Sequence, residues 1–375
     1  MKIKNIRIYR PRKLNPHFHQ SDMVVTIETD SGITGIGEGG GRDTLEQCAA
    51  MLVGEDPQRI QHLWQLMYRG YFYPAGREKL HALGALDLAL WDIKGKHLGA
   101  PLYELLGGLT REYVECYSTG FPWGGSLGET ARACIAAGFR AFRTSVADPG
   151  DGIFNSRRMV DQTVANCREI TESLGGKADW SIDFHTRLDL ADAVRLCGLL
   201  EPYNPLLVED PLRSENPGGL AALRPLVRAP IAVGEQFGDR WDINELIERH
   251  LIDYARVTLP NVGGITEFMK IAALCETHYV GMVPHFTGPI ALAALVHVLS
   301  ALPVPVMMEI TGAAPKQPPH LKLGCTFNEG KLWPEARLGL GVEFDPAGAE
   351  LVAEVNEHSA PIPTYRRPDG SMTNW

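Results

Sequence analysis

Three acidic residues, each at the end of a short apolar segment, limit the folds open to this chain. Asp183, Glu209 and Glu235 follow segments that have the length and composition of buried strands. The interval from the first acid to the second equals the interval from the second to the third. A strand and its helix take roughly 25–30 residues in a (β/α) barrel, and such barrels place functional groups at the C-terminal ends of the strands. We therefore expect the three carboxylates to face one cavity.

Carboxylates so close together would repel one another strongly unless a cation lay between them. Hard divalent cations prefer oxygen ligands, and an all-oxygen set suits Mg²⁺. The alternative is that the acids pair separately with Arg or Lys on neighbouring strands. The equal spacing favours the first interpretation, because unrelated ion pairs do not require it. We predict one Mg²⁺ bound by Asp183, Glu209 and Glu235.

Strands and helices alternate throughout residues 113–335, where we expect the barrel. Expected strands lie at 113–118, 138–145, 178–183, 205–209, 230–235, 252–258, 279–284 and 305–309. Expected helices lie near 126–137, 156–173, 188–200, 217–227, 241–249, 264–277 and 287–301. This alternation predicts an α/β fold with a parallel sheet closed into a barrel.

Residues 1–112 show a different order, with strands first and helices afterwards. Expected strands lie at 2–9, 23–29 and 33–38, and expected helices lie near 44–53, 57–69 and 78–97. The turn Asp30-Ser31-Gly32 joins the second and third strands as a hairpin. We predict a separate α+β domain here, joined by the C-terminal segment 336–375, whose prolines suggest an irregular tail.

Charge and cysteine content narrow the possible partners and compartment. The formal net charge is −9 without any basic block, which argues against nucleic acid or an anionic membrane as the main partner. The seven cysteines are scattered, with no CxxC pair, which favours a reduced, cytoplasmic protein. Residues 1–5 lack the apolar core of a signal peptide. Prolines interrupt the most apolar stretch, 291–308, so it does not predict a membrane span.

Two histidines lie at strand ends beside the acids. His185 comes two residues after Asp183, so an extended chain would point both side chains to the same face. His285 follows the seventh expected strand. The chain has twelve histidines, and a histidine taken at random is more often a surface or structural residue. Their positions make His185 and His285 candidate catalytic residues.

Three further polar residues are expected on barrel strands. Glu309 ends the eighth strand, Thr258 ends the sixth, and Arg143 lies on the second. Glu309 either acts on a substrate or pairs with Arg or Lys. Arg143 either binds a substrate or serves as an ion-pair partner in the barrel mouth. The sequence leaves both alternatives open.

Several segments resemble a known superfamily over nearly the whole chain. They are residues 64–69, 89–96, 263–266 and 288–294, together with the C-terminal Trp375. The chain resembles the enolase superfamily, in the mandelate racemase-like branch of acid-sugar dehydratases, and there the D-galactonate dehydratase group. The resemblance implies a (β/α)₇β modified TIM barrel with an N-terminal α+β capping domain whose loops close over the substrate. It also implies one Mg²⁺ per subunit, held by Asp183, Glu209 and Glu235.

The chemistry implied is dehydration of a small acid sugar, with a galactonate-like aldonate favoured. Mg²⁺ on the substrate carboxylate would spread the charge that forms when the weakly acidic C2 proton leaves. His285 would remove that proton, and His185 would protonate the departing C3 hydroxyl, giving a 2-keto-3-deoxy acid. Glu309 would hydrogen-bond the substrate carboxylate, which requires Glu309 to be protonated or to share a proton.

Two positions depart from the galactonate dehydratase pattern. Thr258 stands where that group has an Asp behind the catalytic His, and Gln236 stands where an Arg often follows the third metal ligand. Thr258 and Arg143 are similar to the mannonate dehydratase-like branch, whose base includes a Tyr in the loop after the second strand. The corresponding loop, 153–157, contains no Tyr. Arg143 is too basic to act as a base itself.

Two other functions remain open on the sequence. The same site suits a racemase, an epimerase or a lactone cycloisomerase, which need no leaving hydroxyl. A non-catalytic protein that only binds an acid sugar is the third possibility. Substrate choice is expected to depend on Arg143 and on capping loops that carry His17, His19 and Tyr73. A homo-oligomer is expected.

Overall fold

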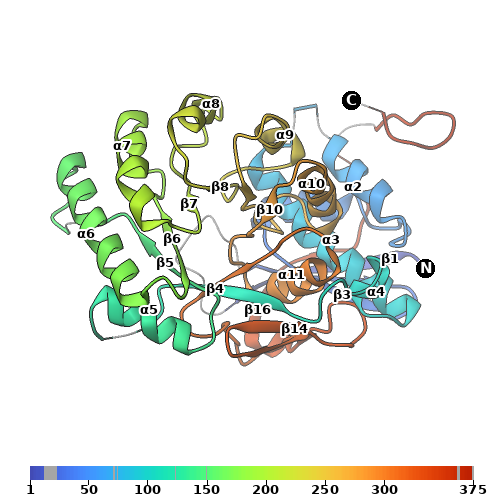
Figure 1. Cartoon of the computed structure of the whole chain (residues 1–375). Coiled ribbons are helices and arrows are strands. Elements are labelled where there is room, and N and C mark those ends of the chain that lie inside the picture. Colours follow the sequence, from blue (N-terminus) through green and yellow to red (C-terminus); the bar gives the residue numbers. More distant parts are fainter. Residues whose placement is uncertain are drawn as a thin grey trace.

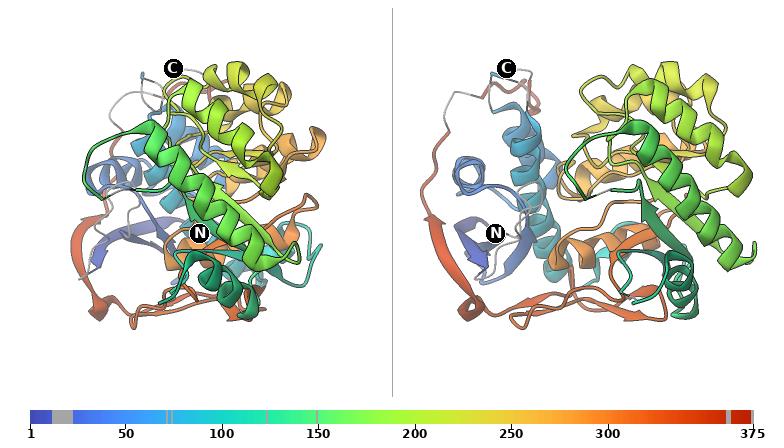
Figure 2. Two further views of the ribbon diagram at one scale, coloured as in Figure 1. Left: turned by 60° about the vertical axis from the view of Figure 1, so that its left-hand side comes forward. Right: turned by 90° about the vertical axis from the view of Figure 1, so that its left-hand side faces the viewer.

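A computed structural model of the chain describes residues 1–11, 23–70, 72–73, 75–122, 124–148, 150–360 and 364–373. An N-terminal α+β unit lies beside a barrel, as Figure 1 and the right-hand view of Figure 2 show. The predicted α/β fold, a (β/α)₇β barrel with a capping domain, is confirmed. The domain boundary expected between residues 112 and 113 stays a prediction.

A four-stranded antiparallel sheet forms the base of the N-terminal unit. β1 (Ile3–Pro11), β2 (Val24–Thr29) and β3 (Thr34–Glu38) follow one another, and β16 (Ala349–Val355) pairs with the other edge of β1. The C-terminal segment is therefore not wholly irregular. In β16 two glutamates flank three apolar residues, and this mixture of charged and apolar side chains suits an edge strand.

Helices cover this sheet and separate it from the barrel. They are α1 (Arg42–Ala50), α2 (Ile60–Arg69), α3 (Arg77–Leu98) and the short α4 (Leu102–Leu105). α3 can approach β3 closely because Gly37 has no side chain, and a Cβ there would overlap the carbonyl oxygen of Ala85. α3 ends at Gly99, whose φ of 68° is the left-handed conformation common after helices.

Eight parallel strands form the barrel among the described residues. They are β4 (Val114–Thr119), β5 (Ala141–Ser145), β6 (Asp179–Asp183), β7 (Val208–Glu209), β8 (Ile231–Val233), β9 (Tyr254–Ala255), β10 (Gly281–Met282) and β11 (Met308–Thr311). Neighbours pair in chain order, and β11 pairs with β4. A bridge between Met282 and Val306 joins β10 to the residues before β11 and closes the ring. Tyr117, Leu207 and Met307 belong to a small apolar cluster formed by barrel residues.

Seven helices connect the barrel strands in the described part of the chain. They are α5 (Leu127–Ala136), α6 (Ser156–Leu174), α7 (Leu190–Leu200), α8 (Gly219–Leu223), α9 (Arg240–Glu248), α10 (Ile265–Thr277) and α11 (Pro289–Ala301). Most match the expected ranges closely, but the helix expected over 217–227 is divided. α8 gives way to a 3₁₀ turn at Arg224–Leu226, because Pro225 has no N–H to continue the α-helical bonding.

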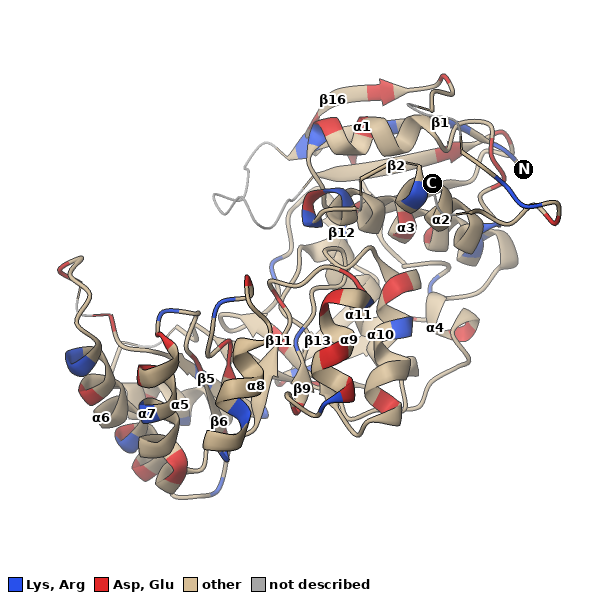
Figure 3. Ribbon diagram, turned by 90° about the horizontal axis from the view of Figure 1, so that it is seen from above, with Lys and Arg blue, Asp and Glu red and all other residues tan. Residues whose placement is uncertain are grey.

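Four further short strands complete the described part of the structure. They are β12 (Leu321–Lys322), β13 (Cys325–Asn328), β14 (Lys331–Pro334) and β15 (Glu343–Phe344). β14 pairs with the first residues of β4, so the β13–β14 hairpin lies at the N-terminal end of the barrel. Charges of both signs are interspersed on the outer helices α6 and α7 (Figure 3). Among the described residues, no helix has the length and apolar content needed to cross a membrane.

Candidate active site

The three predicted acids lie on neighbouring strands at the C-terminal end of the barrel. Asp183 ends β6 and Glu209 ends β7, and the parallel register places the two residues opposite each other. Glu235 follows β8 after Gly234. The side chains of Asp183 and Glu209 are fully buried, whereas Glu235 keeps a small exposed fraction. The equal spacing in the sequence is thus a consequence of the strand-helix repeat.

Two buried arginines lie among these acids. Arg143, on β5, contacts Asp183 through Nη2 and donates from Nε to Glu209 Oε2 at 3.1 Å. Arg256 contacts Glu209 through Nε and donates from Nη2 to Glu309 Oε2 at 2.6 Å. The same Nη2 atom lies 3.8 Å from Glu235 Oε2. The guanidinium charges offset part of the repulsion among the carboxylates.

Arg256 was not identified from the sequence, although a signal was present. It lies within the apolar segment expected as the sixth strand and shares a strand face with Thr258. A charged residue in such a segment usually indicates a buried partner. The structure shows that Arg256 is fully buried and also donates to the hydroxyl of Tyr117 at 2.8 Å.

The carboxylates of Glu209, Asp210 and Glu235 form a group able to hold a metal ion. One oxygen from each lies within 4.8 Å of the others. Oδ2 of Asp210 and Oε2 of Glu235 are buried, and the described residues give neither a hydrogen bond of good geometry. Buried carboxylate oxygens with so few hydrogen bonds suit a hard divalent cation. The group contains two of the three predicted ligands, with Asp210 in the place expected for Asp183.

Burial controls the protonation of this group. It raises the pKa of Glu209 to about 8, although Arg256 and Arg143 oppose the shift. Burial, together with the charge of Glu235, raises the pKa of Asp210 well above its ordinary value. The pKa of Glu235 is raised as well, also mainly by burial. Protons therefore compete with any cation for these oxygens.

His185 lies next to Asp183, but the expected extended backbone is wrong. β6 ends at Asp183, and His185 has a φ of 50° in the left-handed region. Its backbone N–H donates to Asp183 Oδ1 at 2.5 Å, which is the short-range bond of an Asx-type turn. Nε2 of His185 lies 3.5 Å from Asp183 Oδ2, and half of the side chain is exposed.

His285 lies in the segment between β10 and α11, and its nearest acid is Glu235. Nε2 of the buried imidazole lies 3.2 Å from Glu235 Oε2. Thr258, at the position where an Asp was expected, is buried, and the described residues offer its hydroxyl no hydrogen bond. Thr258 thus does not orient the imidazole, and Glu235 is the carboxylate beside it.

Glu309 lies on β11 and is fully buried among donors. It accepts hydrogen bonds from Thr119 Oγ1 at 2.5 Å and from the backbone N–H of Phe286 at 3.1 Å, in addition to Arg256. Burial alone would raise its pKa, but the positive charges of Arg256, His285 and Arg143 outweigh burial and hold it below the ordinary value. We expected a protonated or shared carboxyl, whereas these surroundings favour the carboxylate.

Of the three residues predicted to contact the substrate from the capping loops, the structure describes only Tyr73. Tyr73 lies between α2 and α3, is largely exposed, and packs edge-on against Phe72 with ring centroids 5.3 Å apart. His17 and His19 lie outside the described residues. Their predicted role in substrate binding stays a prediction.

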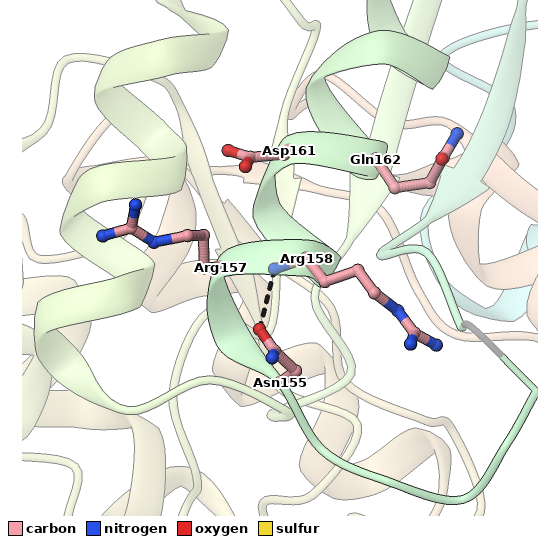
Figure 4. Close-up of a pocket in the computed structure, with 5 residues that line it drawn as sticks. All are labelled: Asn155, Arg157, Arg158, Asp161 and Gln162. Atoms are coloured by element: carbon pink, nitrogen blue, oxygen red, sulfur yellow. Dashed lines mark hydrogen bonds between the residues drawn. The ribbon is translucent and has the colours of Figure 1, made fainter.

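A hollow at the start of α6 lies apart from the acid group. Asn155, Arg157, Arg158, Asp161 and Gln162 line it (Figure 4). Asn155 caps the helix by accepting from the backbone N–H of Arg158 at 3.0 Å, and the Arg158 side chain pairs with Asp151 at 2.7 Å. These two interactions are those of an ordinary helix N-terminus, and they stabilise the start of α6.

Comparison with known proteins agrees with this architecture. Residues 5–107 match the family model of the mandelate racemase / muconate lactonizing enzyme N-terminal domain, and residues 126–348 match the enolase C-terminal domain-like model. D-galactonate dehydratases from Ralstonia nicotianae and Pectobacterium atrosepticum are 37% and 36% identical, with 100% of each chain covered.

Solved structures show the same fold. A mandelate racemase/muconate lactonizing enzyme-like protein from a Roseovarius species has a TM-score of 0.85 at 28% identity, covering 96% of this chain and 99% of that one. An enolase from Agrobacterium radiobacter with bound Na and L-malate has a TM-score of 0.83 at 28% identity, covering 99% of both chains. Both halves of the chain therefore place it in the enolase superfamily, in the mandelate racemase/muconate lactonizing enzyme family.

Proposed function

We propose that the protein is a Mg²⁺-dependent sugar-acid dehydratase, a carbon–oxygen lyase that converts an aldonate into a 2-keto-3-deoxy acid. The observation that carries the proposal is the placement of His185 and His285. They follow the third and the seventh of the eight barrel strands, so they approach the acid group from opposite sides. Full-length identity of 36–37% with D-galactonate dehydratases supports the same reaction class and a galactonate-like substrate.

Asp183, Glu209 and Glu235 would hold one Mg²⁺, with Asp210 next to them. The donor set consists of carboxylate oxygens, and the described residues give the buried Oδ2 of Asp210 no hydrogen bond. When bound, Mg²⁺ supplies positive charge that stabilises the negative charge developing on the substrate carboxylate as the C2 proton leaves.

Each histidine moves one proton. His285 removes the C2 proton, and Glu235, with Oε2 at 3.2 Å from Nε2, stabilises the imidazolium that results. His185 gives a proton to the C3 hydroxyl, which leaves as water. Because half of the His185 side chain is exposed, solvent can replace its proton after each turnover. Proton and hydroxyl depart from opposite faces of the substrate.

The remaining residues orient the substrate. Glu309 is fixed by Arg256, Thr119 and the Phe286 N–H, and as a carboxylate it accepts a hydrogen bond from a substrate hydroxyl. Arg143 contacts both Asp183 and Glu209, and its positive charge favours an anionic substrate beside them. Tyr73, His17 and His19 stay proposed contacts of the capping loops. A homo-oligomer and a cytoplasmic location stay predictions.

A panel of acid sugars, hexonates and pentonates together, tests the function. With Mg²⁺ present, we expect a 2-keto product, trapped as a semicarbazone, from a galactonate-like aldonate. The matched control is His285→Asn, which should give no product and no exchange of the C2 proton with D₂O. Inversion at C2 without 2-keto product would indicate an isomerase instead. Thermal stabilisation by an acid sugar without any C2 exchange would indicate a binding protein.

A further inference from the structure

Helix α11 begins without a capping side chain of its own. Its N-cap residue is Gly288, which has no side chain to accept a hydrogen bond from the first backbone N–H groups of the helix. The usual N-cap residues, Ser, Thr, Asp and Asn, supply an oxygen at this point. The same is true of α10, whose N-cap residue is Gly264. Both helices start at the end of the barrel that carries the acids.

The capping domain supplies the missing acceptors. Glu38, at the end of β3, accepts hydrogen bonds on Oε2 from the backbone N–H groups of Ile290 at 2.9 Å and Ala291 at 3.0 Å. Its side chain is buried, and β3 lies beside α11 (Figure 1). At α10, the Asp87 carboxyl of α3 accepts from the N–H of Thr266 at 3.0 Å. Carboxyl groups from one domain thus cap helices of the other.

Steric fit links Gly288 to Glu38. The backbone of Gly288 has a φ of −63° and a ψ of 167°, values open to any residue and typical of an N-cap. A Cβ at Gly288 would overlap the Glu38 carboxylate. Glycine is therefore required here by the carboxylate and not by the backbone. Gly264 differs, because its φ of 88° itself favours glycine.

The segment held by Glu38 is the one that presents His285. Three residues separate His285 from the first residue of α11, Pro289. Within this short segment the N–H of Phe286 donates to Glu309 at 3.1 Å. The segment is therefore fixed at one end by Glu309 and at the other by Glu38. We propose that Glu38 is a positioning residue, a capping-domain carboxylate that replaces the N-cap of α11 and fixes His285 against the acid group.

This inference rests on the proposed function only for the role of His285, and the cap can be tested without activity. Hydrogen exchange of the Ile290 and Ala291 amides reports the cap directly. For Glu38→Ala we expect their exchange to become at least about tenfold faster. We also expect kcat for the dehydration to fall about tenfold while KM stays within about twofold, because a displaced base affects the chemical step more than substrate binding.

Companion variants separate positioning from general damage. Glu38→Gln keeps an oxygen that can accept from both amides, so amide protection and most of kcat should remain. Gly288→Ser alone should reduce the protection of the two amides and also kcat, since the new side chain overlaps Glu38. In the double variant Glu38→Ala/Gly288→Ser, the amide exchange rates and kcat should return to within about threefold of the wild-type values. The serine hydroxyl can cap α11 in the space that the carboxylate leaves. If Glu38→Ala does not fold, the double variant decides: recovery supports the inference and failure overturns it.

A matched control removes another bond between the domains. Trp91→Phe loses the indole bond to Thr266 Oγ1, 3.0 Å long, without touching α11. Its melting temperature should fall while kcat and the Ile290 and Ala291 amides stay unchanged. Faster amide exchange in Glu38→Ala with an unchanged kcat would overturn the positioning role and leave the proposed function intact. A wild type without turnover on any acid sugar would overturn the function, while the amides still report the cap.

Discussion

Arg256 Nη2 lies 2.6 Å from Glu309 Oε2 in an ion pair that is fully buried on both sides. The same guanidinium contacts Glu209 and lies 3.8 Å from Glu235. The guanidinium of Arg256 therefore offsets the negative charge of carboxylates on or next to three different strands, β7, β8 and β11. A buried charge without a partner is far more costly than one at the surface, so the stability of the barrel mouth depends on Arg256.

Replacing Arg256 by Met should lower the free energy of unfolding by about 3–5 kcal/mol, because Glu309 and Glu209 lose their shared partner. Urea unfolding measures the change. Arg213→Met is the matched control, since the Arg213–Glu215 pair is exposed on both sides, and it should cause no measurable loss. A loss below about 1 kcal/mol in Arg256→Met would show that the carboxylates do not depend on it.

Variants of the acid group should distinguish Asp183 from Asp210 as the third metal ligand. We expect Mg²⁺ to raise the melting temperature of the wild type, and Glu209→Gln and Glu235→Gln to abolish this effect. Asp183→Asn should weaken Mg²⁺ binding at least about tenfold, as calorimetry would show, and Asp210→Asn should have a smaller effect. The reason is that Asp183 and Glu209 lie opposite each other at the ends of neighbouring strands, whereas Asp210 lies one residue beyond the end of β7. The reverse order would make Asp210 the ligand.

His185→Asn should stop dehydration but leave exchange of the substrate C2 proton with D₂O measurable. The physical reason is that His185 follows a barrel strand on the opposite side from His285 and, in the proposed mechanism, would act only on the leaving hydroxyl. NMR of the substrate in D₂O follows the exchange, and semicarbazone formation follows the dehydration. Loss of both by the same factor would instead assign His185 a positioning role.

Thr258→Asp should lower kcat/KM about tenfold and also lower the melting temperature. Glu235 already lies 3.2 Å from His285, so the imidazole does not lack an acid. A further buried carboxylate would add repulsion to a site that holds several. Thr258→Asn, which adds similar volume without charge, is the control. An increase in kcat/KM in the Asp variant would show that His285 lacks a partner in the wild type.

Asp87 should make the protein less stable as the pH rises from about 4 to 7. Burial raises the pKa of Asp87 to about 7, so the folded state keeps the proton in a range where the unfolded chain has lost it. Stability then falls by at most about 1.4 kcal/mol per pH unit within this window and levels off above it. Asp87→Asn keeps an acceptor for Thr266 and should show a flatter profile in urea unfolding. If stability varied with pH in the same way in the wild type and in Asp87→Asn, the pKa of Asp87 would not differ between the folded and unfolded states.

The sequence by itself determined the barrel and the strand ends that carry the acids. The repeat of strand and helix brings Asp183 opposite Glu209, because parallel neighbours in a barrel share a register. The same periodicity located most of the helices. These features follow from local pattern, which a single sequence contains.

Only the tertiary structure decided how the polar groups pair. Arg256 joins Glu209 and Glu309 across the barrel, and Glu38 caps a helix about 250 residues away in the chain. The backbone turn at His185, and not strand alternation, sets the position of its imidazole. Such contacts depend on the angle at which two distant elements meet. Local periodicity does not encode that angle, because it arises from the packing of α3 and β3 against the barrel.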